Sequence, residues 1–137
     1  MTFQEYVRRF VPEEFSVDSD LDRRAKLTAS LAFVSAMTCP AAAVSYLFYG
    51  HYWAIVFVMS ACVCFLCLPA LLRTTRNQAL VAHLQGVITF LMLNSLIFTT
   101  NGLRSTVVQW LPIVPLIMAL LLGKKAMFQW LGVCIAA

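Results

Sequence analysis

Long apolar runs, separated by short polar connections, dominate the chain after residue 26. Four of these runs are long, at about residues 27–49, 52–72, 79–100 and 106–122. At about 1.5 Å per helical residue, the first three each cover a hydrocarbon core of about 30 Å, and the fourth barely does so. We therefore predict an all-α fold, a polytopic membrane helical bundle with four full spans.

A fifth apolar run occupies residues 126–137 and is much shorter than the others. A helix needs about 20 apolar residues to cross the bilayer, so this run predicts a truncated, partial fifth span. We expect either that the chain is a fragment of a longer protein or that it ends inside the membrane.

Residues 1–26 are polar overall and precede the bundle of residues 27–137. Apolar side chains in this segment nevertheless follow the spacing of one helical face, at Phe3, Tyr6, Val7, Phe10 and Val11. The pattern predicts a short amphipathic helix that Pro12 ends. It fits a helix lying on the membrane surface and a docking surface for a partner equally well.

The positions of the charged residues predict how the chain is oriented in the membrane. All six acids lie within the first 22 residues, and the basic residues flank the apolar runs. Counted at the boundaries, Arg23, Arg24, Lys26, Arg73, Arg76, Lys124 and Lys125 fall on one side of the membrane and Arg104 on the other. Cytoplasmic loops carry the excess of Lys and Arg, so we predict a cytoplasmic N-terminus. No cleavable signal peptide is visible.

Composition narrows the function. With 61% hydrophobic residues the chain belongs with integral membrane proteins, whose partner is the lipid bilayer. Its net charge of +4 does not predict nucleic-acid binding, because the basic residues form no stripe with interleaved aromatics. No Ser, His and acid grouping, paired-acid motif or phosphate-binding loop appears, so we expect no enzyme and no cofactor.

The five cysteines are the first candidates for metal ligands. On a helix Cys64 and Cys67 share a face, but Cys62 lies about 200° from Cys64. The histidines, His51 and His83, fall in a connection and at the end of another run. A zinc site needs about four such ligands together, so we predict no metal site, and the odd number of cysteines argues against a disulfide framework.

The third run carries a polar stripe. At about 100° per residue, His83, Phe90 and Asn94 lie within about 20° of one line that leads towards Asn101. An amide in hydrocarbon needs a hydrogen-bond partner, so Asn94 should face the bundle interior. We favour a hydrogen bond between helices and keep contact with a ligand as the alternative.

The entrance to the fourth run contains two prolines. Pro112 cannot donate to the carbonyl of Val108, and Pro115 cannot donate to that of Leu111, so this entrance should be irregular. The freed carbonyls need partners, which implies a cavity or a close neighbour. Ser105 is suited to cap the helix that follows. The candidate cavity or ligand residues are Asn94, Asn101, Arg104, Trp110, Pro112 and Pro115, with His83 a weaker one.

Arg104 and Trp110 also suit the membrane interface. Arginine extends its charge towards phosphates, and tryptophan is enriched at that depth. We favour a phosphate-contacting anchor as the role of Arg104, with ligand contact as the alternative.

The same stretch resembles a known family, the N-terminal multi-span sensor module of bacterial histidine kinases and of diguanylate or adenylate cyclases. Those modules often carry Gly-Gly, two residues, Ser-Pro, an apolar run with Trp and Pro, and Leu-Leu-x-Gly before a basic residue. The corresponding residues are Gly102, Ser105, Trp110, Pro112, Pro115, Gly123 and Lys124. The chain departs from the pattern at Asn101 and Thr106, where glycine and proline are usual.

The resemblance implies a multi-pass protein of the bacterial inner (plasma) membrane. It would perceive a small signal of lipophilic character and relay it by helix displacement, without a catalytic domain of its own. The alternative is a small accessory subunit packed against a larger membrane complex, which would account directly for the missing output domain. A homodimer and a larger membrane complex both stay open as assemblies.

Overall fold

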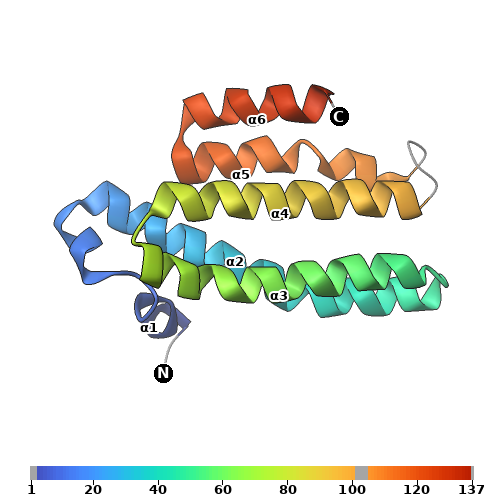
Figure 1. Ribbon diagram of the computed structural model, residues 1–137, viewed down its shortest axis with the longest axis horizontal. Helices are drawn as coiled ribbons and strands as arrows, with labels where there is room; N and C mark the ends of the chain where they lie inside the picture. The colour runs from blue at the N-terminus through green and yellow to red at the C-terminus, as the bar shows by residue number, and fades with distance from the viewer. Residues whose placement is uncertain (1–2, 101–104, 137) are drawn as a thin grey trace.

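The computed structural model describes residues 3–100 and 105–136, and every regular element among them is helical. A short N-terminal pair, α1 (Phe3–Arg8) and the 3-10 helix η1 (Glu13–Val17), leads into three long helices. These are α2 (Ser19–Phe48), α3 (Tyr52–Thr75) and α4 (Gln78–Thr99). The 3-10 helix η3 (Thr106–Trp110), α5 (Ile113–Leu122) and α6 (Lys124–Ala136) follow. The all-α prediction is confirmed (Figure 1).

Three helices, α2, α3 and α4, are long and apolar enough to cross a membrane. The fourth predicted span is not one continuous helix, since η3 precedes an α5 of 10 residues. Pro112 stands at the N-cap of α5, where it marks the break. Pro115 lies in the first turn of α5, where a backbone donor has no partner within the helix, and it therefore does not interrupt the helix.

Local sequence accounts for where the long helices begin and end. Asp18 accepts hydrogen bonds from the backbone N–H groups of Asp20 (2.9 Å) and Leu21 (3.3 Å), which caps α2. Asn77 does the same for α4 through the N–H of Leu80 at 3.0 Å. Gly50, at a φ of +73°, provides the positive φ needed in the turn between α2 and α3.

Helices α2 and α3 form a hairpin, and in each helix buried positions recur with a seven-residue repeat. The buried positions of α2 are small, at Ala25, Ala29, Ala32, Ala36, Cys39 and Ala43. Those of α3 are mostly larger, at Ala54, Val58, Ala61, Phe65, Leu68 and Leu72. Steps of three and four residues keep one face towards a partner helix, and small residues let the two backbones approach closely. We name these two rows the α2–α3 seam.

The N-terminal segment packs onto the bundle. The rings of Phe3, Tyr6 and Phe10 surround Phe33 of α2, with centroids 5.2–6.4 Å from it. Val7 is buried as well, and Glu14 of η1 forms an ion pair with Arg76 beyond α3. The predicted helical face is therefore covered by α2 of the same chain, a partner that neither sequence interpretation included, although Phe3 and Tyr6 stay about half exposed.

The antiparallel order of α2 to α5 brings the charged residues together. The start of α2, the connection from α3 to α4 and the start of α6 lie at the same end of the bundle (Figure 1). Basic residues at this end are Arg23, Arg24, Lys26, Arg73, Arg76, Lys124 and Lys125. We call it the charged end.

Candidate functional site: an apolar groove between α2 and α5

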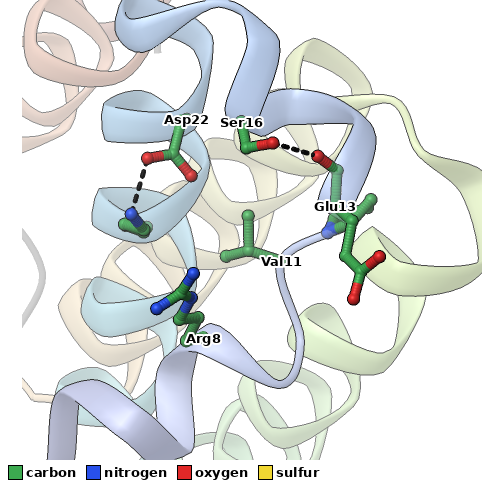
Figure 2. Close-up of a pocket in the computed structure, with 7 residues that line it drawn as sticks. Arg8, Val11, Glu13, Ser16 and Asp22 are labelled. Carbon is green, nitrogen blue, oxygen red and sulfur yellow. Dashed lines mark hydrogen bonds and ion pairs between the residues drawn. The ribbon is translucent and has the colours of Figure 1, made fainter.

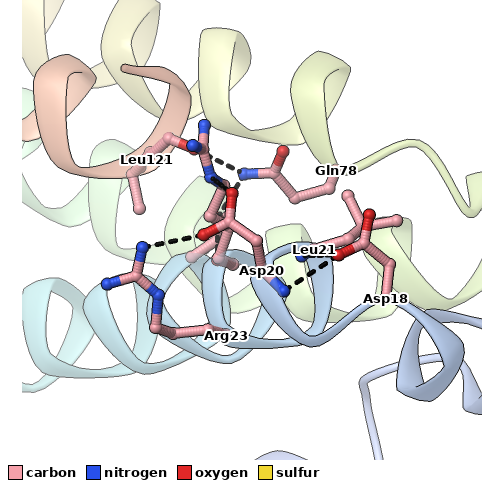
Figure 3. Close-up of polar contacts among 8 residues, drawn as sticks. Asp18, Asp20, Leu21, Arg23, Gln78 and Leu121 are labelled. Carbon is pink, nitrogen blue, oxygen red and sulfur yellow. Dashed lines mark hydrogen bonds and ion pairs between the residues drawn. The ribbon is translucent and has the colours of Figure 1, made fainter.

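Near the charged end, one glutamine ties three helices together. Gln78, the first residue of α4, is 5% exposed. Its side-chain Nε2 donates to the hydroxyl of Thr28 on α2 (3.2 Å) and to the carbonyl of Leu121 on α5 (3.1 Å). Figure 3 shows these contacts beside the Asp18 cap. An amide that satisfies partners on two neighbouring helices fixes their spacing at this level.

Farther from the charged end, a groove opens between the helices. Helix α2 begins beside α4 and α5 and runs obliquely away from them (Figure 1). The resulting groove, with a volume of about 540 Å³, is bounded by α2 and α3 on one side and by α4, η3 and α5 on the other. We call it the α2–α5 groove. Residues that represent its walls are Ser35, Thr38, Tyr46, Thr106, Trp110 and Ile113.

The groove is mostly apolar with a few hydroxyl groups. The hydroxyls of Thr38 and Thr89 donate within their own helices, to the carbonyls of Ser35 and Gln85, each at 2.9 Å. A hydroxyl that donates one hydrogen bond can still accept others through its oxygen. The groove therefore offers acceptors on an apolar wall, which suits an apolar molecule that carries a hydroxyl or N–H donor.

Of the candidate cavity or ligand residues predicted from the sequence, not all line the α2–α5 groove. Trp110 lines the groove and is 58% exposed. Pro112 occupies the N-cap position of α5 and is exposed, and Pro115 is buried in the first turn of that helix. Neither proline is among the lining residues. Asn101 and Arg104 lie outside the described residues.

The irregular entrance to the fourth run has the predicted close neighbour. The Val108 carbonyl accepts from the N–H of Leu111 at 3.2 Å, which closes the 3-10 turn. The Leu111 carbonyl accepts from the N–H of Val114 at 3.2 Å and meets the thiol of Cys134 on α6 at 3.9 Å. Ser105 caps η3 as predicted, through the N–H of Val107. The short final helix therefore supports the proline-broken segment.

The polar stripe of α4 contacts α6. Trp130 of α6 donates its indole N–H to His83 Nδ1 at 3.3 Å and stands edge-on to Phe90 at a centroid distance of 6.3 Å. Asn94 donates to the carbonyl of Phe90, in its own helix, at 3.0 Å. His83 and Asn94 do not line the groove. The hydrogen bond between helices that we favoured for Asn94 is therefore replaced by one within α4.

Sequence reasoning missed Trp130 and the α2 wall of the groove. A small Gly86 between the rings of His83 and Phe90 was a signal for an aromatic partner, because it leaves a notch between them. On α2 the groove residues Ser35, Thr38, Ala42 and Tyr46 recur every three or four residues, beside the small residues of the seam. That second stripe was readable from spacing.

The cysteines occupy different surroundings. Cys62 is buried in the hairpin and its thiol donates to the Ala36 carbonyl at 3.3 Å, whereas Cys64 and Cys67 are exposed. Within residues 3–100 and 105–136, no three His, Cys, Asp or Glu side chains cluster in a way that could hold a metal ion.

The chain matches no protein-family model, and comparisons with curated proteins and with solved structures also gave no match. The resemblance to bacterial sensor modules therefore stays a prediction.

Proposed function

We propose that this chain is a membrane-embedded sensor-like module that binds a small lipophilic ligand in the α2–α5 groove and relays binding by displacement of α2. The observation that supports the proposal is the groove itself. It is apolar, has a volume of about 540 Å³ and lies between helices that meet at Gln78. A volume of this size suits a small ligand.

The contacts suggest how the signal would travel. Gln78 joins Thr28 and Leu121 at one end of the groove, so a ligand that widens the other end would tilt α2 about this point. The N-terminal segment would follow, because it packs on Phe33 of α2. A ligand shifts such an equilibrium only if it binds the two arrangements with different affinity.

The module would sit in the bacterial inner membrane as a multi-pass protein with a cytoplasmic N-terminus. The cluster of basic residues at the charged end supports this orientation, since cytoplasmic segments carry the excess of Lys and Arg. In this arrangement the groove opens in the outer half of the bilayer. We propose no reaction for the chain itself, so its output passes to another domain or protein.

A second candidate function is that of an accessory subunit in a larger membrane complex. The observation that favours it is the outer face of α6, where Phe128, Leu131 and Ile135 are 64%, 39% and 78% exposed. Their spacing of three and four residues is the one that packs against a partner helix. Purification in mild detergent tests it, because an accessory subunit would copurify with other membrane proteins at constant stoichiometry.

Photolabelling tests the proposed groove. A long-chain alcohol carrying a diazirine, incorporated into nanodiscs with the purified protein, should label groove residues of α2 and η3, as mapped by mass spectrometry. Ala42→Trp fills the groove and should abolish most labelling of η3. Ala41→Trp is the matched control, because Ala41 is exposed and does not line the groove. Labelling spread evenly over exposed helix faces and insensitive to Ala42→Trp would refute the proposal.

A further inference from the structure

A second hollow lies between α1 and the start of α2, near the charged end. Its volume is about 590 Å³. Val7 and Arg8 line it from α1, and Arg23, Lys26 and Ser30 line it from α2. We call it the α1–α2 hollow. It is separate from the α2–α5 groove, with which it shares no lining residue.

Positive charge is concentrated in this hollow. Arg8 and Lys26 also line a neighbouring hollow of about 360 Å³ against η1, together with Glu13 and Asp22, so the two hollows share these two cations. Figure 2 shows this neighbouring hollow, with Arg8 at its edge. With Arg23, three basic side chains face the α1–α2 hollow, against one acid, Glu5. Asp20 and Asp22 already offset part of this charge at Arg23 and Lys26, and an anion bound among the three cations would offset more of it.

The internal ion pairs leave donors available. Asp20 holds one nitrogen of Arg23 at 2.8 Å, and Asp22 holds the ammonium of Lys26 at 2.5 Å. A guanidinium has five N–H donors and an ammonium has three, so one carboxylate does not use them all. The hydroxyl of Ser30 adds a polar group to the same wall. Phosphate, with several acceptor oxygens, matches this set of donors.

The remaining wall is apolar and continues along the bundle. Leu27 lines the hollow and is 38% exposed, and Val34, two turns along α2, is 50% exposed. Leu27 is also where the first apolar run begins. A ligand with its phosphate among the basic residues could therefore lay an acyl chain along α2.

We propose that the α1–α2 hollow binds the phosphate of an anionic phospholipid headgroup. The proposal does not depend on a ligand in the α2–α5 groove, since the two sites lie on different faces of α2. The hollow's phosphate chemistry would also admit free phosphate, and the apolar wall is what favours a lipid.

Native mass spectrometry of the purified full chain, titrated with phosphatidylglycerol, tests the site. Arg8→Gln and, separately, Lys26→Gln should each weaken the first lipid-binding step about fivefold, the effect expected for one basic residue near an anionic surface. Arg9→Gln is the matched control, because Arg9 is exposed and lines neither hollow. The unmodified protein should bind phosphatidylcholine more weakly than phosphatidylglycerol.

The alternatives give different results. Equal weakening by Arg8→Gln and Arg9→Gln would indicate diffuse attraction and overturn the site, as would equal binding of the two lipids. Inorganic phosphate at millimolar concentration should not displace phosphatidylglycerol. Complete displacement would assign the hollow to soluble phosphate and refute the lipid.

Discussion

Gly86 is tightly enclosed where α4 meets α5 and α6. A Cβ added there would lie 2.9 Å from Met118 Cε and 2.9 Å from Trp130 Cζ2, distances that require both side chains to move. The glycine therefore lets the indole of Trp130 come close enough to reach His83.

We predict that Gly86→Ala lowers the free energy of unfolding by about 1–3 kcal/mol, the usual cost of overpacking. Thermal denaturation in detergent measures it. Gly132→Ala is the control, because nothing lies within 4 Å of its added Cβ. That change in the helix α6 should be stabilising by about 0.5–1 kcal/mol. Equal effects of the two substitutions would mean that α6 does not pack on α4 as described.

For the single residues of α4, the sequence predicted some positions correctly and missed some contacts. Periodicity correctly put His83 and Phe90 on one face of α4, because that depends only on the helical repeat. It could not show that Trp130 covers the face, since this contact joins positions 47 residues apart in the chain. Asn94 was assigned a partner on another helix, but its side-chain amide donates to the Phe90 carbonyl, one turn back in α4.

Among the elements, the α2–α3 hairpin depends on small side chains. Ala36 is 4% exposed, and its carbonyl accepts the thiol of Cys62. Ala36 is therefore buried against α3, where a larger side chain would have to displace its neighbours.

Ala36→Leu should therefore destabilise the protein by about 1–3 kcal/mol, because it overpacks the seam. Val34→Leu, on the 50% exposed face of the same helix, should change stability little. Thermal unfolding of both variants, followed by circular dichroism in the same detergent, measures the difference. A neutral Ala36→Leu would contradict the packing of this hairpin.

Run length and hydropathy correctly predicted three helices long and apolar enough to cross a membrane, since both properties can be read from the sequence. They also predicted a fourth full span where η3 and the shorter α5 occur. Pro112, at the break before α5, explains that difference. The irregular entrance was predicted from the missing donors of Pro112 and Pro115. The seam repeats every seven residues, but most of the residues beside it on α2 are also apolar, so the repeat does not stand out in the sequence.

For the whole molecule, the main property is its charge asymmetry. The antiparallel helices bring basic residues from three segments to one end, whereas the turn at Gly50 lies at the other. This separation is what the predicted orientation requires.

A reporter enzyme that is active only outside the cytoplasm should be active when fused after Gly50 and inactive when fused after Arg76. Gly50 suits a fusion because nothing lies within 4 Å of its added Cβ. Activity in the opposite pattern would reverse the orientation and place the α2–α5 groove in the cytoplasmic half of the bilayer.

The asymmetry itself followed from counting charges, but the groove did not follow from sequence. Its shape depends on the angle between α2 and α5, which the contacts of Gln78 and the seam set together. Only Trp110, among the predicted ligand residues that the structure describes, lines it. The missing donors of the prolines predicted a cavity or a close neighbour at the entrance to the fourth run, and they did not indicate which helices would enclose a cavity.

The groove runs along the helices, since its lining extends over about three turns of α2, from Ser35 to Tyr46, and it is partly open to the surroundings. In a membrane such an opening faces the acyl chains, so a ligand would reach it after dissolving in the lipid. Occupancy would then follow the mole fraction of the compound in the bilayer rather than its aqueous concentration. Adding more vesicle lipid at a fixed amount of compound would weaken the apparent affinity, although no contact between compound and protein had changed.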